Sequence, residues 1–222
     1  KKEANRCPAA PFTTSTLQQE AARKLRFSVS QTMSIAQKLY EHGLITYMRT
    51  DSTNLSSLAI NTAKEFICNN FGEEYSKVRQ YRTRAKGAQE AHEAIRPTYI
   101  SNTQIEGTPQ EKKLYDLIWK RTVASQMSDA RMLKTDIKVS ANGMEEKFNV
   151  QATQVLFDGF LKLYIEGSDD PQQDDEAVIL PEMNVGDRMF DKEITAECKF
   201  TSAPSRYSEP TLVKKLEELG IG

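Results

Sequence analysis

Apolar and polar residues recur with the spacing of amphipathic helices through the first 132 residues of the chain. We predict four helices in this part, over residues 16–26, 30–42, 56–71 and 111–127. The first begins with a capping signal, Thr16 followed by Gln19. The second carries Tyr40 on its apolar face and ends at Gly43. The polar, basic stretch 81–87 is predicted to be an exposed loop.

The spacing changes after Met132, where apolar and polar residues alternate in short segments, as they do in half-buried strands. We predict four strands, over residues 135–139, 148–153, 161–165 and 194–201. Asn142 and Gly143 form a strong hairpin signal between the first two strands. The acidic stretch 167–176 is predicted to be a loop, and 210–219 to be a helix. Helices followed by antiparallel strands indicate the α+β class.

The composition is that of an ordinary globular chain. It has 222 residues, of which 38% are apolar and 27% charged, enough for one large or two modest domains. No apolar run approaches the ~18 residues of a membrane span, and we expect no signal peptide. Cys7, Cys68 and Cys198 are too few and too far apart for a disulfide framework or a metal motif. We therefore expect reduced thiols in a cytosolic protein.

Charge is divided unevenly along the chain, although the net charge is only −1. Residues 1–133 carry 20 Lys and Arg against 13 Asp and Glu, whereas residues 134–222 carry 10 against 18. The basic half suggests contact with a polyanion, and chance clustering of solvated charges explains it equally well. The chain lacks an initiator Met and stops just past a predicted helix, so we expect a piece of a longer protein.

The segment 43–53 contains the candidate nucleophile. After a short buried strand predicted at 44–45, Tyr47, Arg49 and Asp51 alternate and would lie on one side. A free phenol has a pKa of about 10 and attacks poorly at neutral pH. A guanidinium fixed beside it would favour the phenolate and bind a phosphate oxygen. The alternative, a ring-packing strand tyrosine beside a surface arginine, is the commoner meaning of this spacing.

A second cluster surrounds His92, one of the two histidines of the chain. His92 and Arg96 are four residues apart, so a helical turn would put both on one face. The turn must end there, because Pro97 disfavours helix at Arg96. The pair would suit a phosphate clamp, and a surface helix end with a Glu93–Arg96 ion pair is the alternative. His42 is assigned only to its helix end, where a histidine suits the dipole.

Two further clusters have weaker signals. Four hydroxyl residues at 13–16 stand before a helix, where they can cap it or bind a phosphate, and capping is the commoner role. Asp169, Asp170 and the acidic run 174–176 lie in a turn-rich stretch without the strand context of a metal site. We therefore expect no metal ligands in this chain.

The motifs together resemble those of bacterial type IA DNA topoisomerases. The resemblance rests on Pro-Phe-Thr-Thr-Ser-Thr-Leu-Gln-Gln at 11–19, Gly-Leu-Ile-Thr-Tyr-Met-Arg-Thr-Asp-Ser-Thr-Asn-Leu at 43–55, Glu-Ala-His-Glu-Ala-Ile-Arg-Pro-Thr at 90–98 and Arg-Tyr-Ser-Glu-Pro-Thr-Leu-Val at 206–213, running on to 220–222. Their order and spacing fit from end to end, and the middle two are highly specific. The resemblance implies that Tyr47 cleaves one DNA strand through a 5′-phosphotyrosyl bond. The other strand then passes and the nick reseals, which relaxes negative supercoils without ATP.

The resemblance also implies roles for other residues. Arg49 would contact the scissile phosphate, while His92 and Arg96 would bind DNA near it. The remaining residues expected to contact DNA are Thr14, Ser15, Thr16, Gln37, Glu41, Thr46, Thr50, Asp51 and Arg206. Their partner would be single-stranded or negatively supercoiled DNA in a bacterial cytoplasm, associated with the nucleoid. We expect a monomer and no membrane contact.

The fold implied by the resemblance is a toroid, in which a helical domain bearing the tyrosine is inserted into a β-rich arch. Residues 1–10 would end the first arch segment, 11–133 form the helical domain, 134–203 return as arch and 204–222 open the next helical domain. A TOPRIM domain with Mg²⁺ and a catalytic lysine would precede this chain. Mg²⁺ would therefore belong to the full enzyme and no cofactor to this part, which alone should neither cleave nor relax DNA.

Three rivals remain from the sequence. A tyrosine recombinase also uses Tyr, Arg and His, but it usually places the tyrosine last and leaves a 3′-phosphotyrosine. A DNA-binding module without chemistry would explain the two helices in quick succession, which resemble a helix-turn-helix. A purely structural α+β domain is the third.

Overall fold

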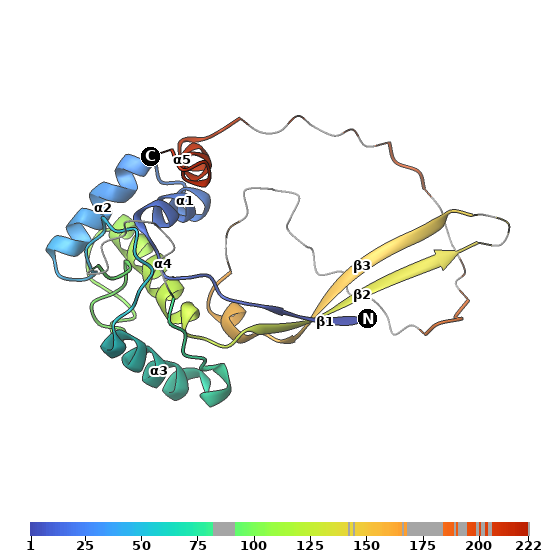
Figure 1. The fold of residues 1–222 in the computed structure, drawn as a ribbon, viewed down its shortest axis with the longest axis horizontal. Helices are drawn as coiled ribbons and strands as arrows, with labels where there is room; N and C mark the ends of the chain where they lie inside the picture. Colours follow the sequence, from blue (N-terminus) through green and yellow to red (C-terminus); the bar gives the residue numbers. More distant parts are fainter. Residues whose placement is uncertain are drawn as a thin grey trace.

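The computed structural model has the predicted α+β architecture, with a group of helices from which a long sheet projects (Figure 1). Four helices and their connections form what we call the helical body. They are α1 (Thr14–Leu25), α2 (Val29–Glu41), α3 (Ser57–Phe71) and α4 (Pro109–Ser125). The structure describes residues 1–81, 92–141, 143, 145–165, 167, 184–188, 190, 195–198, 200, 203 and 206–221.

Helix α4 lies in the core of the helical body and packs against α1 and α2. Leu114 and Ile118 are fully buried. The buried aromatic residues of α4 also satisfy their polar atoms: the Tyr115 hydroxyl donates to the Asn102 carbonyl at 2.6 Å, and the Trp119 indole donates to the Ile100 carbonyl at 2.8 Å. The loop 99–105 is thereby fixed to the helix.

The first helix begins earlier than predicted. Its cap is Thr13, whose hydroxyl accepts from the backbone N–H of Thr16 at 3.3 Å, while the Thr16 hydroxyl accepts from the Thr13 N–H at 2.9 Å. The predicted Thr16–Gln19 capping signal is therefore wrong, because the reciprocal pair forms three residues upstream. The helix ends at Leu25, and Arg26 takes a left-handed conformation with φ of 59°.

The other three helices of the body are confirmed with shifts of one or two residues at their ends. Ser28 caps α2 and Ser56 caps α3, each through its hydroxyl. Helix α4 starts with Pro109 behind a capping box formed by Thr108 and Glu111, so it begins two residues before the predicted start.

The sheet has three antiparallel strands in the order β1 (Lys2–Arg6), β2 (Ala130–Ser140) and β3 (Lys147–Phe157). Strand β1 pairs only with residues 130–134, so the outer half of the sheet is a two-stranded ribbon that extends away from the helical body (Figure 1). The two predicted strands at 135–139 and 148–153 are confirmed and are longer than predicted. Gly143 has φ of +83° between them, as a tight hairpin turn needs, and Asn142 lies outside the described residues.

Two other predicted strands are wrong where they are described. Residues 161–162 belong to the 3₁₀ turn η2 (Gly159–Lys162) and 163–165 follow it, because Phe160 and Tyr164, four residues apart, are both buried in the core. Gly159 permits this turn with φ of +49°, and a Cβ there would lie 2.5 Å from the carbonyl oxygen of Ser128. In the segment 194–201, the described residues 195–198 and 200 are not in a strand.

The last helix, α5 (Glu209–Glu218), agrees with the prediction to within one residue and lies beside α1 (Figure 1). The predicted basic loop 81–87 lies outside the described residues except for Tyr81, and the acidic loop 167–176 except for Gly167.

Candidate active site around Tyr47

Tyr47 lies on the loop between α2 and α3, between residues that are anchored in the core. Gly43 turns the chain after α2 with φ of +68°. Ile45 and Met48 are buried, whereas the Tyr47 side chain is 40% exposed. The strand predicted at 44–45 is reduced to a single bridge between Ile45 and Pro97. The phenol is therefore presented at the surface on a loop that is held from beneath.

Two aromatic rings lie beside Tyr47. The Tyr40 ring meets it edge-on, with centroids 5.3 Å apart and planes at 65°. The His92 ring lies 6.4 Å away at 35°. Tyr40 was predicted on the apolar face of its helix, but it is 41% exposed because it covers Tyr47 rather than the core. The family resemblance gave no role to Tyr40. Its position one turn before the loop was the only feature of the sequence that indicated a contact with Tyr47.

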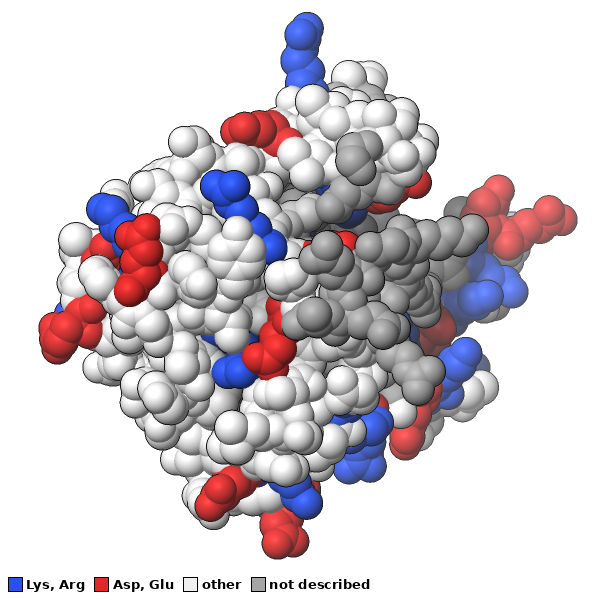
Figure 2. Space-filling model, turned by 60° about the vertical axis from the view of Figure 1, so that its left-hand side comes forward, with Lys and Arg blue, Asp and Glu red and all other residues white. Residues whose placement is uncertain are grey.

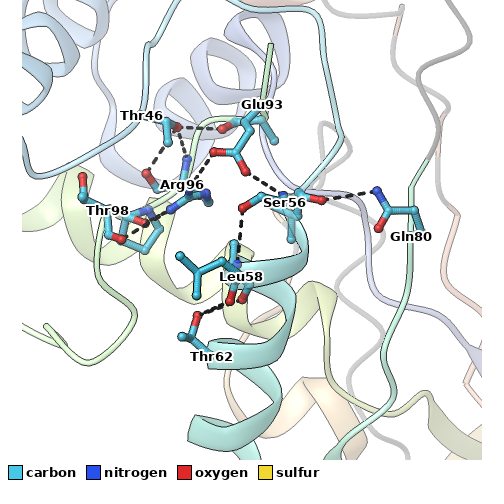
Figure 3. Close-up of polar contacts among 12 residues, drawn as sticks. Thr46, Ser56, Leu58, Thr62, Gln80, Glu93, Arg96 and Thr98 are labelled. Atoms are coloured by element: carbon cyan, nitrogen blue, oxygen red, sulfur yellow. Dashed lines mark hydrogen bonds and ion pairs between the residues drawn. The ribbon is translucent and has the colours of Figure 1, made fainter. Parts of the chain in front are cut away.

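On one side, the loop is paired with the extended segment 94–98 (Figure 3). The Thr46 N–H donates to the Arg96 carbonyl at 2.9 Å, and the Arg96 N–H donates back to the Thr46 hydroxyl at 2.9 Å. That hydroxyl donates to the Ala94 carbonyl at 2.7 Å. The Thr98 N–H donates to the Leu44 carbonyl at 2.9 Å. The residue before Tyr47 is thus fixed by backbone and side-chain bonds together.

On the other side, the loop is tied to the first residue of α1. The Thr14 N–H donates to the Thr50 carbonyl at 2.8 Å. The Thr14 hydroxyl donates to the carbonyls of Met48 and Thr50, at 2.9 and 3.1 Å, and accepts from the Thr50 N–H at 2.8 Å. The loop that carries Tyr47 is therefore hydrogen-bonded both before and after the tyrosine.

The helical turn predicted over 92–96 is wrong. The described residues there are extended, with Ile95 bridged to Phe12, because their backbone groups bond to neighbouring segments rather than to each other. Pro97 favours this extended form. His92 and Arg96 consequently do not share a helix face, and only His92 lies against Tyr47.

Arg96 forms the ion pair that was the alternative to DNA binding. Its guanidinium lies 2.6 Å from the Glu93 carboxylate and donates to the carbonyls of Pro97 and Thr98 (Figure 3). The Glu93 carboxylate also accepts from the Ser56 N–H at 2.6 Å, at the start of α3. Burial alone would raise the pKa of Glu93, but the hydrogen bonds from Arg96 and Ser56 outweigh it and lower that pKa.

Arg49 and Asp51 are exposed, and neither has a hydrogen-bond or ion-pair partner within the described part of the chain. The loop bends at 48–49 instead of continuing as a strand, so the alternation predicted for Tyr47 and Arg49 is interrupted. Within the described residues, no hydrogen bond, ion pair or ring contact joins the side chains of Tyr47 and Arg49. Arg49 is in consequence available to an incoming anion.

The remaining predicted DNA-binding residues fall into two groups. Several hydroxyls are engaged inside the protein: Ser15 accepts from Gln19, Thr16 belongs to the cap of α1, and Thr50 accepts from the Ser52 N–H. The other residues lie on or beside helices: half-buried Gln37 donates to exposed Glu41 at 2.7 Å on α2, and exposed Arg206 precedes α5. His42 is the C-cap of α2, as predicted.

Charge on the surface is mixed. Figure 2 shows Lys and Arg interspersed with Asp and Glu on the face that contains the outer side of the helical body, rather than one continuous basic patch. The described residues hold no group of three His, Cys, Asp or Glu side chains arranged for a metal ion. Among them, no helix is both long and apolar enough to cross a membrane.

Comparison with known proteins gives one consistent result. The family model described as DNA topoisomerase matches residues 1–222. "DNA topoisomerase 1" of Mycolicibacterium smegmatis is 49% identical over the whole chain, which covers 25% of that protein. "DNA topoisomerase 1" of Zymomonas mobilis is 48% identical over the whole chain, which covers 19% of that protein. The chain thus spans about a quarter or less of these relatives.

A solved structure agrees with the sequence comparisons. Full-length topoisomerase I from Thermotoga maritima superposes with a TM-score of 0.75 at 36% identity. The match covers all of the present chain and 36% of that chain.

Proposed function

The chain belongs to the bacterial type IA DNA topoisomerases, and from this membership we propose that it supplies the tyrosine that cleaves DNA in a longer enzyme. The observation that carries the proposal is the exposed phenol of Tyr47 on a loop hydrogen-bonded on both sides. A nucleophile needs access to its target and a fixed position, and this loop provides both.

The reaction is a transesterification. The Tyr47 oxygen attacks the phosphorus of a DNA backbone phosphate and forms a 5′-phosphotyrosyl ester, while the bond from phosphorus to the 3′ oxygen breaks. The phenol loses its proton and the leaving 3′ oxygen gains one. Resealing reverses each step after strand passage. One phosphate ester replaces another, so the link preserves the bond energy and ATP is not needed to relax negative supercoils.

Arg49 and His92 are the proposed partners of the phosphate. Arg49 is exposed without a protein partner in the described chain, so its guanidinium can turn to the scissile phosphate and stabilise developing charge. His92 lies beside the phenol ring and can bind the backbone near the cleavage site. Ion pairs and hydrogen bonds within the protein favour a structural contribution over direct DNA contact for Arg96, Thr14, Thr16 and Thr46.

Mg²⁺ does not fit the described residues of this chain, because they bring together no cluster of possible ligands. Any Mg²⁺ of the full enzyme would be bound by a TOPRIM domain outside this chain, and no step above is assigned to it. We propose that the complete protein acts as a monomer on single-stranded and negatively supercoiled DNA in the bacterial cytoplasm. The domain limits at residues 10, 133 and 203 are part of the same proposal.

The decisive experiment is Tyr47→Phe in the full-length protein that contains this sequence. We expect the variant to bind a single-stranded oligonucleotide as the wild type does and to form no covalent adduct. Tyr40→Phe is the matched control: it removes a neighbouring hydroxyl, keeps the ring that packs on Tyr47, and should retain adduct formation. Unchanged relaxation by Tyr47→Phe would refute the proposal and leave a binding module or a structural domain.

The end of the cleaved strand to which the protein is joined distinguishes this reaction from that of a tyrosine recombinase. End-labelled oligonucleotides should show the protein on the 5′ phosphate, whereas a 3′-phosphotyrosine would indicate a recombinase-like reaction. The isolated chain should form no adduct with either label, and a sensitive assay that detects one would contradict that part of the proposal.

A further inference from the structure

Thr14 occupies an unusual place for a threonine at the start of a helix. The cap of α1 is Thr13, so the N-terminus of the helix does not need the Thr14 hydroxyl. That hydroxyl instead reaches a loop 34 to 36 residues away, where it donates to the Met48 and Thr50 carbonyls and accepts from the Thr50 N–H. It therefore serves the Tyr47 loop rather than its own helix.

The single donor hydrogen of this hydroxyl is used within the protein. A threonine hydroxyl has one hydrogen to donate and two lone pairs to accept with. The carbonyls of Met48 and Thr50 share the hydrogen, and one lone pair accepts a hydrogen bond from the Thr50 N–H at 2.8 Å. No hydrogen remains to donate to a phosphate, so the bonds of this hydroxyl argue against the DNA contact expected from the motif.

The bonded groups bracket the nucleophile. The Met48 carbonyl belongs to the residue directly after Tyr47, and the Met48 side chain is 1% exposed. Thr46, directly before Tyr47, is fixed by the segment 94–98. With both neighbours fixed, the backbone at Tyr47 has little freedom, and Thr14 supplies the side-chain bonds after the tyrosine.

We propose that Thr14 is a positioning residue for Tyr47, whose hydroxyl holds the 48–50 backbone so that the phenol points at the scissile phosphate. The inference rests on the proposed function and assigns Thr14 no contact with DNA. A nucleophile misplaced by about 1 Å can lose about 10²-fold in rate even when the substrate still binds. Loss of this hydroxyl should therefore slow cleavage far more than it weakens binding.

The test is made in the full-length protein with Thr14→Val, which keeps the side-chain shape and removes the hydroxyl. Single-turnover adduct formation on a single-stranded oligonucleotide gives the rate, and fluorescence anisotropy gives the Kd. We expect the rate to fall by about 10²-fold and the Kd to stay within about threefold. Thr14→Ser keeps the donor and acceptor and should stay within about fivefold of the wild-type rate.

Thr62→Val is the matched control, because within the described residues the Thr62 hydroxyl bonds inside α3 alone, to the carbonyls of Leu58 and Ala59 (Figure 3). It should leave rate and Kd within about twofold. A Thr14→Val rate within about threefold of wild type would overturn the inference. A Kd that weakens as much as the rate falls would also overturn it, because Thr14 would then be a DNA ligand.

If Thr14→Val does not fold, Thr14→Ser is compared with Thr14→Cys, which is similar in size but a weak hydrogen-bond donor. Positioning by the hydroxyl requires the serine variant to cleave at least about tenfold faster, and equal rates would refute it. If the proposed function itself is wrong, the wild-type protein will form no adduct, and this result is distinct from a slow Thr14 variant.

Discussion

The helical body and the β-ribbon are stabilised in different ways. Nearly all buried apolar residues of the described chain lie in the helices or the segments that join them, and Ala130 is the only one in a strand. In the outer ribbon, Ile137 pairs with Val150 and Val139 with Phe148 on one face, and these side chains remain at least partly exposed. A dense core therefore fixes the Tyr47 loop, whereas backbone pairing and partly exposed cross-strand contacts maintain the ribbon.

The largest expected effect is loss of core volume in the helical body. Ile118→Ala removes buried methyl groups from the centre of α4 and should lower the free energy of unfolding by about 2–5 kcal/mol. Chemical denaturation of the 222-residue chain, followed by circular dichroism, measures it. The matched change in the ribbon is Ile137→Ala, which should cost less than about 1 kcal/mol. Equal losses would show that the ribbon has a core of its own.

Breaking the Glu93–Arg96 pair should rank second. Glu93→Gln leaves the guanidinium of Arg96 without its carboxylate and weakens the bond to the start of α3, at a cost of about 1.5–3 kcal/mol. The same denaturation experiment applies. Glu106→Gln is the control, because Glu106 is fully exposed, its partner Lys112 is about half exposed, and such a surface pair should contribute nothing measurable. A loss of unfolding free energy as small as that of Glu106→Gln would mean that other groups bond the Arg96 guanidinium when the Glu93 carboxylate is absent.

The junction between the two regions should show a smaller effect. Asp129 lies just before β2 and accepts from Lys77 and Arg79, both at 2.5 Å. Asp129→Asn should cost about 1 kcal/mol and act on the ribbon more than on the body. Amide hydrogen exchange should become faster in β2 and β3 and stay unchanged in α4. Uniform acceleration would show that the two regions unfold together.

The smallest expected effect is the pH dependence of the Glu93 pair. Because the pKa of Glu93 is lowered in the folded state, its contribution is fully present above the ordinary value of 4.5. It is lost as the pH falls through the folded-state pKa. The stability difference between wild type and Glu93→Gln should therefore shrink as the pH is lowered from 6 to about 3. A difference that stays constant over this range would contradict the assigned pair.

The local part of the structure could be predicted from the sequence. Helical periodicity placed α2, α3 and α4 to within two residues, and alternation placed β2 and β3, since both signals depend on neighbours a few residues apart. Where a tertiary demand opposed the local pattern, the prediction failed. Residues 161–165 alternate as a strand does, yet they form no strand, because Phe160 and Tyr164 are buried in the core from a 3₁₀ turn.

The candidate site divides in the same way. The sequence by itself identified the motif around Tyr47 and the family, because the order of residue types is a property of the chain. Only the tertiary structure decided that Arg96 bonds to Glu93 and that the Thr14 hydroxyl holds the Tyr47 loop. The Thr14 and Thr46 hydroxyls bond backbone atoms 34 to 50 residues away. Their partners depend on how α1 and the segment 94–98 pack, which no spacing along the chain encodes.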